Sequence, residues 1–123
     1  MKKLFVAFFL YLLLPNIAMS THMDKVLFLE IVKTGDIREK NFLRLYLKGI
    51  LHGIEASNMT LIKDGNRPLF CNPQDIPLTI DWLIDNLLAY FARYPLIPDS
   101  ISIPVVASYT MKDKFPCAKV IGQ

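Results

Sequence analysis

The sequence predicts an all-α fold, a small single-domain bundle of about four helices with one intrachain disulfide. Two segments repeat apolar residues with the period of an amphipathic helix, and residues that start or stop helices flank them. The chain also contains only two cysteines and begins like an exported protein. About one hundred residues follow the apparent export signal, which is enough for one domain with a modest core.

The first twenty residues have the features of a secretory leader. Two lysines precede an unbroken apolar run over residues 4–14, and this run is too short to span a hydrocarbon core about 30 Å thick. Ala18 and Ser20 are the small residues expected before a cleavage site. We therefore expect residues 1–20 to be removed, leaving a periplasmic domain over residues 21–123 with no stable membrane anchor. The alternative is an envelope structural protein whose anchor is not cleaved.

Loss of the leader nearly neutralises the chain. Two of its 14 basic residues lie in the leader, which leaves 12 basic residues against 11 acidic ones, so the net charge falls from +3 to +1. Such a balance provides no basic stripe to neutralise phosphates. We therefore expect no nucleic-acid partner.

Two helices are predicted in the first half of the mature chain. Residues 23–36 hold a short apolar run that Gly35 closes as a helix-ending glycine. Residues 36–58 begin with Asp36 and Glu39 in capping-box spacing. The period of this second helix places one set of residues on its apolar side: Phe42, Leu43, Tyr46, Leu47, Ile50, Gly53 and Ile54.

Gly49 and Gly53 flank the apolar side of this second helix. Glycine destabilises a helix by about 1 kcal/mol relative to alanine, so we expect another helix to pack closely against them.

Turn residues dominate residues 59–77, which predicts a long connection. Asn58 begins a formal glycosylation acceptor sequence, but the leader has a bacterial character and we interpret Asn58 as a helix end.

Two more helices are predicted in the second half. Residues 78–95 have a cap at Thr79 and a stop at Pro95, and their apolar face holds Ile80, Leu83, Ile84, Leu87, Leu88, Phe91 and Tyr94. The last helix begins after Ser100 or Ser102, has Pro104 in its first turn and ends near Phe115.

Cys71 and Cys117 are predicted to form the disulfide. Two cysteines in an exported chain favour a bridge over free thiols, and this bridge would tie the start of the third mature helix to the end of the fourth. A loop of 46 residues corresponds to about 4 kcal/mol in the chain-entropy model. No CxxC motif and no cationic cluster adjoins either cysteine, so we interpret the bridge as structural and not redox-active.

The sequence contains few candidates for catalysis or metal binding. The only histidines are His22, next to the expected cleavage site, and His52, on the predicted solvated face. Asp81 and Asp85 lie four residues apart on a helix, which is more typical of a wetted face than of an acid/base pair. We therefore predict no catalytic residues, no metal site and no cofactor.

Two features suggest protein recognition. Trp82 and Arg93 lie opposite the apolar face of the third helix, and these residue types often carry binding energy at interfaces; the alternative is that Trp82 covers a loop of its own chain. The turn after this helix is restricted by two prolines, which lowers the ordering cost of binding. The predicted partner-binding residues are Trp82, Arg93, Tyr94, Leu96, Ile97 and Asp99. Leu96 and Ile97 would alternatively turn inward to cap the core.

Four motifs in order along the chain resemble the Rap/Tai family of type VI secretion immunity proteins. They are "LYLKGILHGIEASN", "LFCNPQ", "LLAYFARYP" and "FPC", and the matching positions are Tyr46 with Gly49, Cys71 with Pro73, Tyr90 with Tyr94 and Pro95, and Phe115 to Cys117. The resemblance covers most of the mature chain, although Phe91 stands where an aliphatic residue is expected.

The resemblance implies a periplasmic all-helical protein that binds a peptidoglycan amidase and blocks its active-site cleft. The family is often dimeric, so a homodimer is the second expected partner. A different function remains open, that of a periplasmic acid-stress chaperone of the two-cysteine, all-helical kind. Such a chaperone unfolds in acid to expose apolar surface, whereas an immunity protein has no reason to do so.

Overall fold

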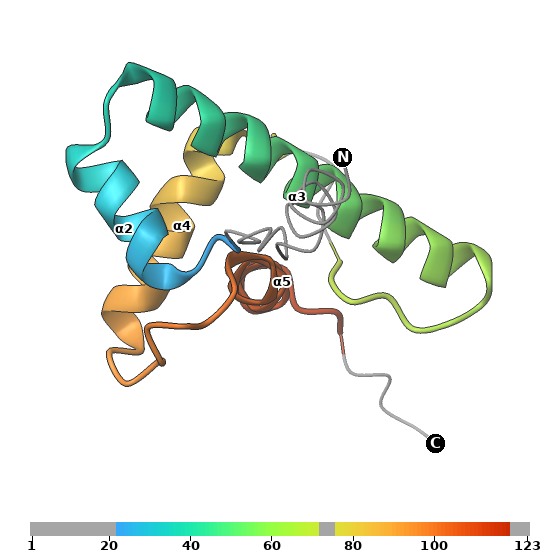
Figure 1. Cartoon of the computed structure of the whole chain (residues 1–123). Helices are drawn as coiled ribbons and strands as arrows, with labels where there is room; N and C mark the ends of the chain where they lie inside the picture. The colour runs from blue at the N-terminus through green and yellow to red at the C-terminus, as the bar shows by residue number, and fades with distance from the viewer. Residues whose placement is uncertain (1–21, 72–75, 119–123) are drawn as a thin grey trace, which may run out of the picture.

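The computed structural model describes residues 22–71 and 76–118. Within these ranges the chain forms four packed helices and no strand: α2 (Lys25–Thr34), α3 (Ile37–Lys63), α4 (Ile80–Arg93) and α5 (Ile103–Lys114). In Figure 1, α3 crosses the whole view and α5 is seen end-on. The other three helices all pack against α3, and α4 also packs against α5. The predicted all-α bundle with one disulfide is confirmed.

Side chains from all four helices meet in one core. The largest fully buried ones are Phe28, Leu43, Leu47, Leu83, Leu87, Ile103, Met111, Val106 and Thr110. Their spacing follows the helical period, because positions three or four residues apart share a face. The apolar face predicted for α4 is confirmed at Leu83, Leu87 and Phe91, which are buried, whereas Tyr94 is exposed.

The capping signals act largely as predicted. Asp36 and Glu39 form a complete capping box at the start of α3, and Thr79 accepts a hydrogen bond from the Trp82 amide at the start of α4. Ser102 precedes α5 but makes no capping bond with its side chain. Gly35 ends α2 with an ordinary negative φ, and it is needed for space, since a Cβ there would lie 2.5 Å from the Ile31 carbonyl oxygen.

The predictions for α3 need three corrections. The helix continues to Lys63 and does not end at Asn58. Its buried residues are Leu43, Leu47, Leu51, Ile54 and Asn58, whereas Phe42 and Gly53, which we had placed on the apolar side, are exposed. Within residues 22–71 and 76–118 no helix packs against Gly49 or Gly53, because a Cβ at either would meet none of the described atoms within 4 Å. The apolar residues of α3 therefore divide between two faces, and the core uses one of them.

A short contact ties the start of the described chain to the start of α5. Asp24 and Ser102 form an isolated antiparallel bridge. The Lys25 amide donates to the Ile101 carbonyl oxygen, and the Ile103 amide donates to the Met23 carbonyl oxygen, both at 3.0 Å. The turn between α4 and α5 is therefore anchored where it joins α5.

Candidate partner-binding site

The turn at the end of α4 gathers most of the predicted partner-binding residues. An open hollow of about 530 Å³ is lined by Arg93, Tyr94, Pro95, Leu96, Ile97 and Pro98. The side chain of Leu96 is 95% exposed, whereas Ile97 is partly buried against the core. The inward alternative is therefore correct for Ile97 and wrong for Leu96.

Lys25 of α2 braces this turn from the side. Its Nζ donates to the Ile97 carbonyl oxygen and to Asp99 Oδ1, each at 2.9 Å. The carboxylate of Asp99 is thus used within its own chain, as a support for the turn. The sequence did not indicate Lys25, because it lies 74 positions from Asp99 and no local pattern joins them.

Aromatic side chains extend the surface of the turn onto neighbouring helices. The rings of Tyr90 and Tyr94 are 4.7 Å apart, and the Arg93 guanidinium lies 5.4 Å from the centre of the Tyr94 ring. Burial raises the pKa of the Tyr90 hydroxyl, and the nearby Asp113, Tyr94 and Tyr109 raise it further. Tyr90 and the exposed Tyr109 were not among the predicted partner-binding residues. Tyrosine is common at interfaces, and this was the available signal.

Trp82 lies away from this surface, about three helical turns before Arg93 on α4. Its ring stacks on Phe115 with a centroid distance of 5.5 Å and an interplanar angle of 20°. The side chain is only partly buried and packs against the core. The alternative in which Trp82 covers a neighbouring part of its own chain is the one that the structure shows.

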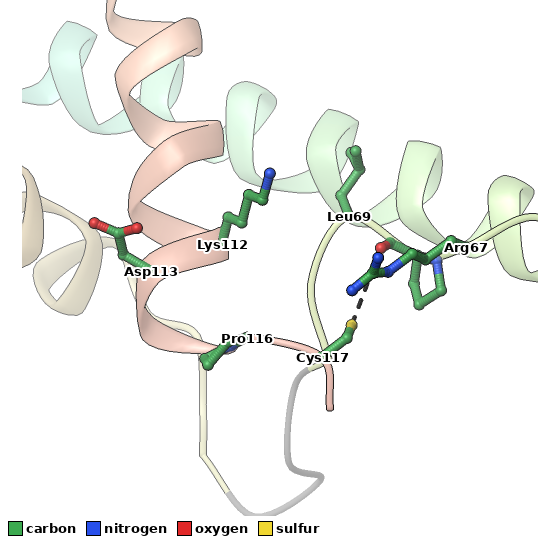
Figure 2. Close-up of a pocket in the computed structure, with 7 residues that line it drawn as sticks. Arg67, Leu69, Lys112, Asp113, Pro116 and Cys117 are labelled. Carbon is green, nitrogen blue, oxygen red and sulfur yellow. Dashed lines mark hydrogen bonds between the residues drawn. The ribbon is translucent and has the colours of Figure 1, made fainter. Parts of the chain in front are cut away.

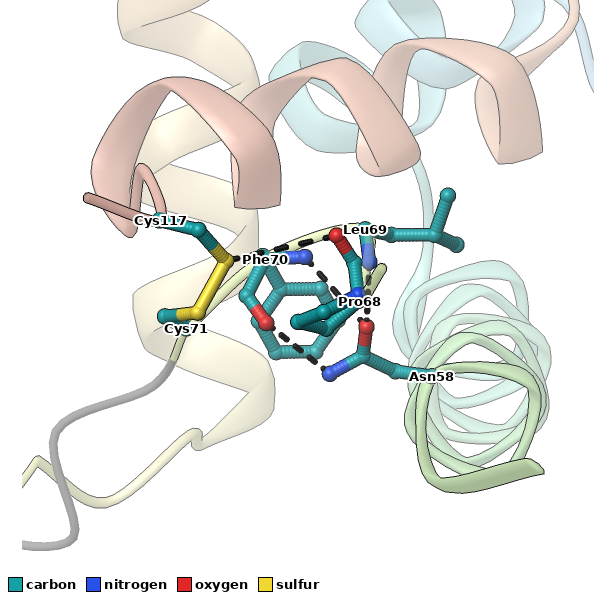
Figure 3. The surroundings of a disulfide bond; sticks show 6 residues. All are labelled: Asn58, Pro68, Leu69, Phe70, Cys71 and Cys117. Carbon is teal, nitrogen blue, oxygen red and sulfur yellow. Dashed lines mark hydrogen bonds between the residues drawn. A yellow bond between two sulfur atoms is a disulfide. The ribbon is translucent and has the colours of Figure 1, made fainter. Parts of the chain in front are cut away.

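The disulfide between Cys71 and Cys117 is present, as predicted, with Cα atoms 4.9 Å apart (Figure 3). Next to it, the Cys71 amide donates to the Phe115 carbonyl oxygen at 2.8 Å. The connection that leaves α3 is therefore fixed to the end of α5 by a covalent bond and a hydrogen bond.

Asn58 holds the backbone just before this disulfide (Figure 3). Its Nδ2 donates to the Phe70 carbonyl oxygen at 3.0 Å, and its Oδ1 accepts from the amides of Leu69 at 2.6 Å and Phe70 at 3.3 Å. Asn58 is buried, so the folded chain leaves no free amide for glycosylation. Its position four residues after Ile54 on the buried face was the available signal for this role.

A second hollow, of about 580 Å³, lies beside the disulfide (Figure 2). Its lining includes Arg67 from the connection after α3 and Lys112 and Asp113 from α5. Cys117 Sγ lies 4.0 Å from the Pro68 carbonyl oxygen, and because the disulfide sulfur carries no proton this is only a contact. The hollow mixes both charge signs and contains none of the predicted partner-binding residues.

Of the two carboxylates considered for catalysis, Asp81 forms an ion pair, whereas Asp85 is exposed. The Arg44 guanidinium forms an ion pair with Asp81 and, chiefly through this hydrogen bond, holds the pKa of the Asp81 carboxyl below its usual range. A lowered pKa makes a carboxylate a poorer general base at neutral pH. Among residues 22–71 and 76–118, no three His, Cys, Asp or Glu side chains are grouped to hold a metal ion.

Comparisons with protein-family models, curated proteins and solved structures find no match to this chain. No helix in the described part of the chain has both the length and the apolar character needed to cross a membrane. The expected leader, its cleavage site after Ser20, and Pro73 of the Cys-x-Pro motif lie outside the described residues.

Proposed function

We propose that this chain is a periplasmic immunity protein that binds a peptidoglycan amidase of type VI secretion and blocks its active-site cleft. The sequence resemblance to the Rap/Tai family suggests the class of partner. The observation that carries the mechanism is the exposed side chain of Leu96 on a braced turn. The protein would act by occupying the cleft and would carry out no reaction.

The turn suits this role because its shape is largely fixed before binding. Pro95 and Pro98 restrict the backbone on either side of Leu96, and the two hydrogen bonds from Lys25 hold the carbonyl of Ile97 and the carboxylate of Asp99. A prearranged turn loses little conformational entropy when it enters a cleft. Leu96 would be the apolar anchor of the contact.

The residues around the turn match the composition of binding hot spots. Arg93 and Tyr94 stack beside Leu96, and Tyr90 and Tyr109 continue the surface. Tyrosine and arginine are enriched among the residues that dominate binding energy, usually with neighbours that exclude water. This arrangement supports a protein partner more than a small metabolite, because the hollow is open and apolar.

The test is inhibition of amidases encoded beside this gene. The full chain is co-expressed with each candidate amidase, and we expect co-purification with one of them and rescue of cells from its toxicity in the periplasm. Leu96→Asp should weaken that complex about 30-fold or more, the effect of losing an anchor worth about 2 kcal/mol. The matched control is Leu69→Asp, which changes another exposed leucine outside the turn.

The free Leu96→Asp protein should melt at the temperature of the unchanged chain, because Leu96 supports no core contact. If Leu96→Asp and Arg93→Ala both bind the amidase normally, the inhibitory surface lies elsewhere. If no adjacent amidase is bound or inhibited, the proposed function is wrong. Intact Met1 on protein recovered from the periplasm would contradict removal of the leader.

The acid-stress chaperone makes a different prediction for the same protein. It should protect client proteins from aggregation at about pH 2–3 and lose its own fixed packing there. We expect no client protection at that pH. Protection together with failure to bind any amidase would favour the chaperone.

A further inference from the structure

Helix α3 presents an apolar face that no other described element covers. Phe42, Leu45 and Met59 are 59%, 70% and 71% exposed. Between them, a Cβ at Gly49 or Gly53 would enter open space. Glycine is a poor helix former, and no contact within the described chain explains two glycines in the middle of this helix.

This face has the alternating spacing of a coiled-coil seam. Steps of four and three residues connect eight positions: Arg38, Phe42, Leu45, Gly49, His52, Ala56, Met59 and Lys63. We call these eight positions the α3 seam. Between Phe42 and Met59, over about 25 Å of helix, the only polar residue of the seam is His52.

We propose that the α3 seam joins two copies of this chain through an antiparallel pair of α3 helices. A two-fold axis near the middle of the seam sets Phe42 against the partner's Met59, Leu45 against the partner's Ala56, and Gly49 against the partner's His52. Large and small residues then alternate across the central layers, so the two backbones approach closely at the glycines.

Charge complementarity on one flank favours this register. Lys48 and Glu55 are one heptad apart beside the seam, and the two-fold axis places Lys48 opposite the partner's Glu55, twice per dimer. Opposite charges at such flanking positions set partner choice and orientation. A parallel pair would place Lys48 opposite the partner's Gly53 and lose both ion pairs.

The other flank fits by shape. Tyr46 comes opposite the partner's Gly53, where the single chain has open space. The ring of Tyr46 already stacks on Phe42, with centroids 6.4 Å apart, so its position is prepared before association. At the ends of the seam, Arg38 comes opposite the partner's Lys63, where contact with solvent screens the repulsion.

The test begins with the mass of the protein in solution. The full chain is expressed, purified and measured by sedimentation equilibrium over a concentration series, where we expect a reversible dimer. Lys48→Glu and Glu55→Lys should each weaken the dimer by about tenfold or more, since each places like charges opposite one another twice. The double variant carrying both changes should return close to the original affinity. Lys40→Glu, on the same helix but off the seam, is the matched control.

A second variant separates association from folding. Gly53→Leu should fold as the unchanged chain does and, at a concentration where the unchanged chain is monomeric, melt at the same or a higher temperature, because its side chain meets open space and improves helix formation. The same change should abolish the dimer by filling the space for the partner's Tyr46. A chain that is monomeric at all concentrations would overturn the proposal. A dimer that these variants leave intact, or that the double charge exchange fails to restore, would show that a different surface or register is used.

Discussion

Replacement of Asn58 by alanine should destabilise the protein by about 2–3 kcal/mol. The change removes the groups that bind the Phe70 carbonyl and the Leu69 amide, at 3.0 and 2.6 Å, together with a longer bond to the Phe70 amide. A buried group left without its hydrogen bond costs about 1–3 kcal/mol. The Leu69 amide is only partly buried, so its lost hydrogen bond should cost an amount at the lower end of that range. Alanine forms helices better than asparagine, and this offsets about 0.5 kcal/mol of the loss.

The measurement is urea unfolding with the disulfide intact, analysed as a two-state transition. Ser57→Ala is the control, because Ser57 is an exposed neighbour whose hydroxyl bonds only to the Gly53 carbonyl of its own helix, and we expect a change below about 0.5 kcal/mol. Asn58→Asp keeps the oxygen that accepts from the Leu69 amide, but it replaces the amide nitrogen that donates to the Phe70 carbonyl with a second oxygen. Because two oxygen acceptors then face each other, this variant should also destabilise the protein at neutral pH. An Asn58→Ala chain as stable as the Ser57→Ala control would refute this account.

Three further predictions concern stability. Cys117→Ser should cost a few kcal/mol by opening the 46-residue loop, which unfolding in urea would measure; equal stability would contradict a structural bridge. Gly35→Ala should cost more than about 1 kcal/mol, because its Cβ would press on the Ile31 carbonyl; an unchanged melting temperature would show that α2 adjusts freely. The pKa of Asp81 is lower in the folded chain than in the unfolded chain, so its ion pair stabilises the fold fully above the ordinary aspartate pKa of about 3.9. This stabilisation is lost as the pH falls through the lower pKa of the folded chain. Asp81→Asn should therefore reduce stability slightly at neutral pH, less so in high salt, and not in strong acid.

The sequence predicted the helices and the disulfide because those features depend on local signals. Asp36 with Glu39 and Thr79 specify helix starts through bonds within a few residues. The pairing of Cys71 with Cys117 needed only their number and the expectation of export. The prediction for Asn58 was wrong because it also used a local signal, namely that asparagine commonly ends helices. The actual role of Asn58, a hydrogen bond to Phe70, is a tertiary contact.

The face that α3 buries could not be decided from its sequence. Both sides of the helix carry apolar residues. The helical period is therefore consistent with a buried face that includes Phe42 and equally with one that includes Leu51. Only packing against α2, α4 and α5 selects the second. At the candidate site, Leu96 and Ile97 are chemically similar neighbours, so the sequence does not distinguish the exposed one from the partly buried one, and the hydrogen bond from Lys25 to the Ile97 carbonyl is a contact between distant residues.

The disulfide also determines how the protein would respond to a pulling force. Residues 72–116, which include α4 and α5, lie inside a covalent ring, so tension between the chain ends passes through α2, α3 and the bridge and bypasses that ring. Reducing the bridge would release about 160 Å of additional extension. The turn with Leu96 lies inside the ring, but its brace at Lys25 lies in the loaded part. Tension would therefore remove that brace while the ring around the turn stays closed.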